Sequence, residues 1–400
     1  MTLFVSAAGD ESDEVKTFTL PQKRAMAKKH IALVSVDTFD PNLADGGSRA
    51  VYEALRFLRC RNHRVAFYNF YSNERCRLRN FCPDLYPAQK GDSTGNLADD
   101  GIIVCEHPVS SSYHQSVVPD GFLPQVMDVL RGEPVDLAIT GDADYLALLA
   151  VSILNLPGVH IFNASGNIER FRMLPVSLRG MLRKRAVLTV SDYLRKMIKR
   201  RLNVSSDVWF NRFDFACGAG PSLNGNSAVG FYSSGTKTKG EDVVRKLLEM
   251  IPSTPVVVAG HALSGPVEDF PCPPNLFNIG WVDDIGRFFE QVKVLIVPSL
   301  IDEGFSRIIL EASMRGIPVI ANRIGGIPEA LGESGILVGL GRKESLDIDR
   351  LATIYRSHVE NLLSNKEVYD KYRRQALNRA AAYRDMQERN SQEIYDKYFA

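Results

Sequence analysis

The sequence lacks long apolar runs and paired cysteine motifs. Its longest apolar runs, such as Tyr145 to Leu156, are too short to span a bilayer. Residues 1–29 have neither the basic start nor the apolar core of a signal peptide, and we expect them to form a mobile tail. The six cysteines show no Cys-x-x-Cys pair and no matching histidine spacing, which favours free thiols in a reducing compartment. Together these absences predict a cytoplasmic protein.

An excess of one charge is also missing. The chain has 48 basic and 47 acidic side chains, and its net charge of +1 gives no electrostatic reason to expect a nucleic-acid partner. Hydrophobic residues make up 45% and charged residues 24% of the chain, as in ordinary globular proteins. Because 400 residues exceed the usual size of one hydrophobic core, we expect two domains.

The first domain is expected over residues 30–215 and opens with a short apolar strand at 30–36. A loop with Gly46 and Gly47 follows, and Ser48 can cap the next helix. A second apolar strand comes after that helix. Strand, glycine loop, helix and strand begin a doubly wound α/β domain, and Gly47 lies at the strand end where such sheets bind ligands. Two adjacent glycines are also common in plain turns.

The Asp142-Ala143-Asp144 segment has an Asp-x-Asp form that binds divalent metal in one class of nucleotide-sugar enzymes. Here it falls at a junction between a strand and a helix, where aspartates also cap helices. We favour the capping or acceptor-side interpretation and expect no metal site.

Residues 179–201 are unusually basic, with Asp192 as the only acid among them. Apolar residues such as Met181 and Leu194 interleave with the cations. A basic, partly apolar helical surface is attracted to an anionic membrane face. A solvated helix with snorkelling side chains would show the same pattern.

A linker is expected at residues 216–226, where glycine, proline, asparagine and serine gather. Alternating strands and helices then predict a second Rossmann-like domain over 227–375. The charged, tyrosine-rich segment 376–400 is expected to form a terminal helix that crosses back to the first domain.

The most informative stretch runs from a strand at 294–298 through a short loop into a helix. Gly304 allows a sharp turn, and Ser306 is a good N-cap candidate. Glu303 therefore lies on the loop and Glu311 more than one turn into the helix. The unpaired N–H groups between these carboxylates suit an anion, so the pair can hold a polyhydroxylated ligand that carries phosphate.

At this point the sequence resembles glycosyltransferase family 4, whose members have the GT-B fold of two Rossmann-like domains facing a cleft. The strong matches are Glu303-Gly304-Phe305, Glu311-Ala312, Gly316-Ile317-Pro318-Val319 and Gly325-Gly326-Ile327-Pro328-Glu329. Weaker matches are Gly46-Gly47, Ser191, Asn211-x-x-Asp214 and Lys239-Gly240.

The resemblance implies retaining transfer of a sugar from a UDP- or GDP-linked donor, without metal or other cofactor. Glu311 would hold the ribose hydroxyls, and Glu303 a sugar hydroxyl. Lys239 would neutralise the leaving diphosphate, with Glu303 and Asn163 as the other catalytic residues. The acceptor would be a glycan or a lipid-linked molecule. The implied donor site comprises Gly47, Lys237, Lys239, Trp281, Val282, Glu303, Gly304, Phe305, Ser306, Arg307, Ile308 and Glu311.

Three positions depart from the family pattern. Ser234 stands where the family usually has a phosphate-binding arginine, and Lys237, Arg212 or Arg323 are possible substitutes. Asn163 replaces a histidine; it can bond a sugar hydroxyl but carries no proton at neutral pH. Arg212 replaces a glycine.

An active transferase in surface polysaccharide or glycolipid synthesis is our leading hypothesis. The alternative is a catalytically weak member that serves as a sugar- or nucleotide-binding partner subunit. A phosphorylase or an epimerase has less support, because neither a pyridoxal phosphate site nor a role for the acid pair is evident.

Overall fold

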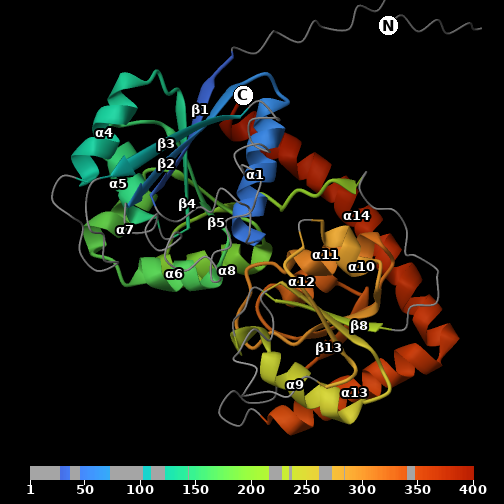
Figure 1. Cartoon of the computed structure of the whole chain (residues 1–400). Coiled ribbons are helices and arrows are strands. Elements are labelled where there is room, and N and C mark those ends of the chain that lie inside the picture. The colour runs from blue at the N-terminus through green and yellow to red at the C-terminus, as the bar shows by residue number, and fades with distance from the viewer. Residues whose placement is uncertain are drawn as a thin grey trace, which may run out of the picture.

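A computed structural model describes residues 28–36, 46–72, 102–109, 122–142, 144–215, 228–233, 237–260, 273–282, 284–339 and 347–400. These residues form two α/β domains joined along one side by a long terminal helix (Figure 1). Most of the expected tail, the expected linker at 216–226 and Ser234 lie outside the described residues, as does the side chain of Lys237.

The first domain is built on a parallel sheet of seven strands in the order β3-β2-β1-β4-β5-β6-β7. The strand order reverses direction between β1 and β4, as in doubly wound folds. The strands are β1 His30–Val36, β2 Arg64–Ser72, β3 Ile103–Val109, β4 Leu137–Gly141, β5 Gly158–Phe162, β6 Ala186–Thr189 and β7 Asp207–Val208. The helices are α1 Gly46–Arg59, α4 Phe122–Gly132, α5 Tyr145–Ile153, α6 Ser165–Arg172, α7 Val176–Leu182 and α8 Asp192–Leu202.

The second domain repeats this plan with a parallel sheet of six strands, β10-β9-β8-β11-β12-β13. The inner strands of both sheets are buried on both faces and are almost continuously apolar, whereas Phe277 of the edge strand β10 is 51% exposed. The strands are β8 Ala228–Ser233, β9 Val256–Gly260, β10 Leu276–Gly280, β11 Val292–Val297, β12 Val319–Asn322 and β13 Gly335–Val338. The helices are α9 Glu241–Met250, α10 Ile285–Phe289, α11 Arg307–Met314, α12 Ile327–Leu331, α13 Ile348–Ser364 and α14 Lys366–Tyr398, with a 3-10 turn at Lys237–Lys239 before α9.

Two details of the first domain differ from expectation. The α1 helix begins at Gly46, so the glycine pair forms its first turn and does not precede a cap at Ser48. The basic stretch 179–201 is not one helical surface, because buried β6 divides it. Within it, the Arg185 guanidinium is used internally, donating to the backbone carbonyls of Leu156 and Ala138.

The domains share a continuous apolar core across their junction. Phe213 before the linker, Phe305 after β11 and Tyr383 of α14 belong to one cluster of buried side chains. Their rings meet in pairs, with centroids 5.5 Å apart for Phe213 and Tyr383 and 5.6 Å for Phe305 and Tyr383. This packing holds the two sheets in a definite arrangement.

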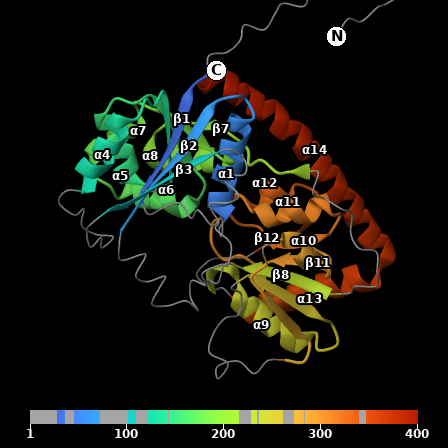
Figure 2. The ribbon, with the colours of Figure 1, turned by 45° about the horizontal axis from the view of Figure 1, so that its top comes forward.

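The α14 helix spans both domains. It starts on the second domain, and its end lies beside β1 and α1 of the first in both views (Figures 1 and 2). It is continuous from Lys366, so the boundary expected at residue 376 falls inside one helix. Its Gln387 side chain bonds both backbone groups of Phe213, and Asn390 bonds Phe210. The chain between the domains is therefore held along the helix.

Candidate functional site

A cleft of about 430 Å³ lies between the two domains. Its first-domain wall comes from the start of α1, the loop after β5 and the segment after β7. Its second-domain wall comes from β8, the turn before α9, and the loop between β11 and α11. The polar, charged and aromatic residues that line the cleft include Arg49, Asn163, Asn211, Tyr232, Lys239, Trp281, Asp302, Glu303, Arg307 and Glu311.

The loop after β11 forms the centre of the second wall. Strand β11 ends at Val297 and helix α11 begins after Ser306, which occupies the N-cap position. The Ser306 side chain makes no capping hydrogen bond, so the loop and not the hydroxyl sets the start of the helix. Glu303 lies on the loop and Glu311 in the second turn, as the sequence predicts.

The domains approach each other closely at Gly304. A Cβ atom added there would lie 2.2 Å from the carbonyl oxygen of Asn163, so no side chain fits. The Ser191 hydroxyl donates to the Gly304 carbonyl over 2.6 Å. The Ser165 hydroxyl donates to the carbonyl of neighbouring Asp302. The second-domain loop that carries Glu303 is thus held by residues of the first domain.

Glu329, in the first turn of α12, caps a helix of the opposite domain. Its carboxylate accepts hydrogen bonds from the backbone N–H groups of Asp192 and Tyr193, over 2.8 and 2.9 Å. An anion at a helix N-terminus is stabilised by the exposed N–H groups there. Gly326, three residues earlier, donates its own N–H to the Glu303 carbonyl over 2.7 Å. Contacts of α12 therefore orient the cleft rather than fill it.

Lys239 and Glu303, two of the predicted catalytic residues, form an ion pair across the second wall. The Lys239 Nζ and Glu303 Oε1 atoms are 3.0 Å apart. The exposed fractions of the two side chains are 28% and 11%, so the pair is partly shielded from water. A phosphate group that enters the cleft can displace the Glu303 carboxylate from the Lys239 ammonium. Glu303 is then free to accept a hydrogen bond from a ligand hydroxyl.

Arg307 lines the cleft, and its guanidinium extends to the domain junction. It donates to the carbonyl of Arg212 over 3.1 Å and lies 4.2 Å from the centre of the Phe213 ring. Its Nε atom is 3.9 Å from Glu311. Burial lowers the pKa of the Arg307 guanidinium, while the carboxylates of Glu311 and Glu53 raise it. Its side chain therefore helps to position Glu311.

Asn163 forms the first wall where β5 ends. The Asp142 carboxylate accepts from the Asn163 backbone N–H over 2.8 Å and from its Nδ2 group over 3.3 Å. Burial raises the pKa of Asp142, and these hydrogen bonds lower it. The Asn163 Oδ1 atom is buried and has no hydrogen-bond partner among the described residues. An oxygen left over at a cleft wall can accept a hydrogen bond from a ligand hydroxyl.

The Asp-x-Asp segment has structural roles, in agreement with the capping interpretation. Asp144 is the N-cap of α5 and accepts from the Ala147 N–H over 3.0 Å. Asp142 holds Asn163 in place, as described above. The same carboxyl groups are thus already occupied by backbone and amide donors.

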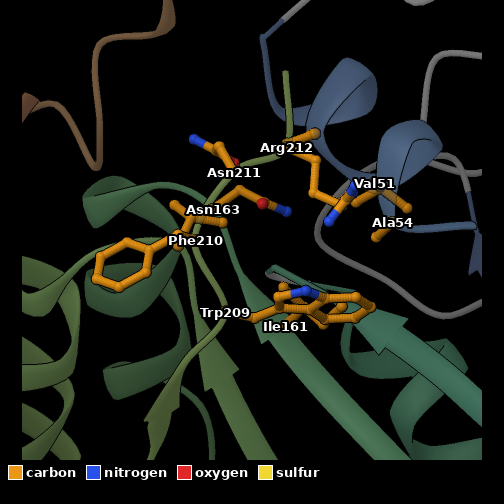
Figure 3. Close-up of a pocket in the computed structure, with 10 residues that line it drawn as sticks. Val51, Ala54, Ile161, Asn163, Trp209, Phe210, Asn211 and Arg212 are labelled. Atoms are coloured by element: carbon orange, nitrogen blue, oxygen red, sulfur yellow. The ribbon is translucent and has the colours of Figure 1, made fainter. Parts of the chain in front are cut away.

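A small side pocket opens next to Asn163, as Figure 3 shows. Asn163, Asn211 and Arg212 lie above the ring of Trp209, with helix α1 on one side. The pocket measures about 10 Å³, enough for roughly one water molecule. The Asn211 Oδ1 atom is also buried without a described partner. The first wall therefore offers two amide oxygens to a ligand.

Most predicted site residues come together in this cleft. Those that line it are Asn163, Lys239, Trp281, Glu303, Gly304, Phe305, Ser306, Arg307, Ile308 and Glu311. Val282 follows Trp281 but does not line the cleft, and Gly47 is in the first turn of α1, two positions before Arg49.

Several lining residues were not predicted as site residues, among them Arg49, Ser165, Asn211 and Tyr232. Arg49 was the easiest to find, because it follows the glycine pair at the start of a helix. Tyr232 ends a predicted strand, as ligand-contacting residues of parallel sheets often do. Ser165 carries no local signal, because its position depends on how the domains meet. Asn211 carries only the weak Asn211-x-x-Asp214 match, which does not place it in the cleft.

Comparison with known proteins relates this chain to glycosyltransferases. Residues 239–354 match the family model described as glycosyl transferases group 1. An uncharacterized glycosyltransferase of Methanocaldococcus jannaschii is 23% identical over 198 residues, which are 46% of this chain and 50% of that protein. The chain thus spans half the length of this relative, and less of other curated glycosyltransferases that it resembles.

Two solved structures share the architecture along almost the whole chain. A glycosyltransferase from Rickettsia africae superposes with a TM-score of 0.68 at 15% identity, covering 93% of this chain and 99% of that one. Anabaena HepE, solved in complex with UDP-glucose, superposes with a TM-score of 0.67 at 17% identity, covering 92% and 98%. No helix in the described part of the chain is both long and apolar enough to cross a membrane. The chain therefore has the GT-B fold, and its second domain carries a glycosyl transferases group 1 match.

Proposed function

We propose that this protein is a retaining, metal-independent glycosyltransferase of family 4. It moves a sugar from a nucleotide diphosphate sugar to a glycan or lipid-linked acceptor. The observation that carries the proposal is the convergence of Lys239, Glu303 and Glu311 on one interdomain cleft, opposite Asn163. One cation and two acceptor-only carboxylates match the phosphates and hydroxyls of such a donor.

Each of these residues has a distinct part in the proposed reaction. Glu311 accepts hydrogen bonds from the two ribose hydroxyls, and Arg307 holds the carboxylate in place. The Lys239 ammonium leaves the Glu303 carboxylate and pairs with the diphosphate. Glu303 then accepts a hydrogen bond from a sugar hydroxyl. Asn163 Oδ1 accepts from a further hydroxyl at the first wall.

The chemical step depends mainly on stabilising the leaving diphosphate. As the bond between the anomeric carbon and the phosphate oxygen breaks, negative charge grows on the diphosphate beside Lys239. The acceptor hydroxyl forms the new bond on the same face and passes its proton to the leaving phosphate. No pair of carboxylates flanking the bond is needed, in contrast to glycoside hydrolases.

UDP is the first nucleotide to test, with GDP second. HepE, which shares the fold, was solved with UDP-glucose. In the present chain Trp281 lines the cleft and lies after β10, at a strand end suited to contact a base. The proposal needs no cofactor beyond the nucleotide sugar. Turnover that survives EDTA supports metal independence, and restoration of lost turnover by Mg²⁺ or Mn²⁺ would refute it.

We place the proposed membrane contact at the turn between α6 and α7, next to the basic stretch 179–201. Met173 and Val176, which flank the turn between α6 and α7, are 77% and 74% exposed. Arg183 and Lys184, at the end of α7, are exposed nearby in the chain. Exposed apolar side chains with neighbouring cations suit the inner face of an anionic membrane, where lipid-linked acceptors of surface polysaccharides or glycolipids are held.

Vesicle flotation tests this contact. Binding to vesicles that contain phosphatidylglycerol should fall as salt rises, and it should fall for the double variant Met173→Ser, Val176→Ser. Binding that ignores salt and both substitutions would remove the membrane part of the proposal.

The alternative is a catalytically weak subunit that binds a sugar or nucleotide for a partner. The Lys239–Glu303 pair favours it, because each group already satisfies the other without substrate. The two candidates differ in turnover. A panel of UDP-, GDP- and ADP-sugars with a natural acceptor pool should release one nucleoside diphosphate, and Glu311→Ala should abolish the release. Binding without release from any donor would favour the partner subunit.

A further inference from the structure

The described residues that line the cleft carry three cations, and two of them have acidic partners. Lys239 pairs with Glu303 at 3.0 Å, and Arg307 lies 3.9 Å from Glu311. The third is Arg49, whose guanidinium makes no hydrogen bond or ion pair with another described residue. Arg49 therefore leaves a positive charge uncompensated in a half-buried position. Such a charge favours an anionic ligand.

The position of Arg49 on α1 strengthens this field. The helix begins at Gly46, so Arg49 lies next to the unpaired N–H groups of its first turn. Helical side chains lean toward the N-terminus of their helix, which brings the guanidinium toward those groups. The field of Arg49 reaches across the cleft: it opposes the rise of the Tyr232 pKa, which burial takes to about 12.

Of the three substitutes expected from the sequence for the missing arginine, the side chain of Lys237 lies outside the described residues, and the two arginines do not line the cleft. Arg212 donates to Ser391 and Glu388 of α14, over 2.8 and 2.9 Å, and its guanidinium lies 4.4 Å from the centre of the Phe57 ring. It borders only the small side pocket. Arg323 is exposed and does not line the cleft.

We propose that Arg49 is the second phosphate-binding cation, contacting the donor diphosphate from the first domain while Lys239 contacts it from the second. The inference rests on the proposed function and adds the residue that replaces the arginine missing at Ser234. A guanidinium can grip two phosphate oxygens at once, which an ammonium cannot. The diphosphate then bridges the two domains, and its binding favours their closed arrangement.

Arg49→Gln tests this inference by calorimetric titration with UDP, GDP and ADP, and with the matching monophosphates. For the diphosphate that binds the unmodified protein, we expect the Kd to rise about 10- to 100-fold, the effect of losing a charge-assisted hydrogen bond. The Kd of the matching monophosphate should rise less than about threefold, because the monophosphate presents fewer phosphate oxygens. Arg49→Lys should recover part of the loss.

Two controls separate phosphate binding from a structural role. Arg131→Gln makes the same change on the exposed surface of α4 and should leave every Kd unchanged. The Tm of ligand-free Arg49→Gln should equal or exceed that of the unmodified protein, because Arg49 lies in the repulsive field of Arg307. A lower Tm, or an equal loss of mono- and diphosphate affinity, would overturn the inference.

The outcomes also distinguish this inference from the proposed function. If Lys239→Ala loses diphosphate affinity and Arg49→Gln does not, the function stands and the role of Arg49 is wrong. If the unmodified protein binds none of the three diphosphates, both are wrong.

Discussion

The two walls of the cleft are built on opposite principles. The second-domain wall holds charged groups in pairs, Lys239 with Glu303 and Arg307 near Glu311. The first-domain wall offers neutral amide oxygens on Asn163 and Asn211, and one cation without a described partner, Arg49. A charged ligand can displace one member of an ion pair, whereas an amide oxygen without a partner can accept a hydrogen bond from a ligand hydroxyl. The second wall is therefore suited to the phosphates and hydroxyls of the donor, whereas the first wall offers two amide oxygens for further hydroxyls and one more cation for phosphate.

The largest effects are expected from breaking the second wall. Lys239→Ala should lower kcat by about 10²–10³-fold, because the leaving diphosphate loses its nearest cation. Steady-state kinetics with the preferred donor measures the loss. Lys246→Ala, which removes an exposed lysine of α9, is the matched control and should keep full turnover. Equal turnover in both variants would show that Lys239 does not meet the leaving group.

A smaller effect is expected from the first wall. Asn163→Ala should lower kcat/KM by about 2- to 10-fold, the worth of one neutral hydrogen bond. Asn167→Ala is a close control: its side chain also bonds the Asp142 carboxylate, but it does not line the cleft. If both variants lose the same activity, Asn163 acts by supporting Asp142 and not by contacting the sugar.

The first wall should also be the more sensitive to acid. Burial lowers the pKa of His160 to about 3, and the neutral ring bridges the Thr140 hydroxyl and the Asp142 carbonyl, at 2.8 and 3.0 Å. The unfolded chain binds this proton first, near pH 6.5. The free energy of unfolding should therefore be highest above pH 6.5 and fall by about 1.4 kcal/mol per pH unit as pH drops from there toward 3.

Denaturant titrations between pH 4.5 and 7.5 measure this slope. His160→Phe should flatten it, even though the variant is less stable at neutral pH because Thr140 loses its partner. An unchanged slope would assign the acid sensitivity to other groups.

The contact that sets the two walls face to face is expected to have the smallest effect. Glu329→Ala removes the acceptor for two N–H groups at the start of α8. We expect a loss of about 1 kcal/mol in the free energy of unfolding, as for other helix caps. Glu333→Ala, at an exposed position just after α12, should change it by less than about 0.5 kcal/mol. Equal losses would mean that Glu329 adds nothing across the junction.

The sequence predicted the second wall far better than the first. Glu303 and Glu311 are carried by one strand, loop and helix, so local spacing was enough to place them. Both parallel sheets were also predictable, because their strands are short apolar runs between helices. Ser165 and Asn211 could not be placed in the cleft, because their relation to it depends on packing between distant segments. The basic stretch misled for a different reason: it was treated as one helical surface, although the short apolar run of β6 divides it.

The most direct test of the account is the thermal shift of the protein with UDP, GDP, ADP and their sugar conjugates, compared with that of Lys239→Ala. One nucleotide series should raise the Tm of the unmodified protein, because a ligand bound only to the folded state stabilises it. The same series should raise the Tm of Lys239→Ala much less. No shift with any series, or equal shifts in both proteins, would contradict a nucleotide-sugar site in this cleft.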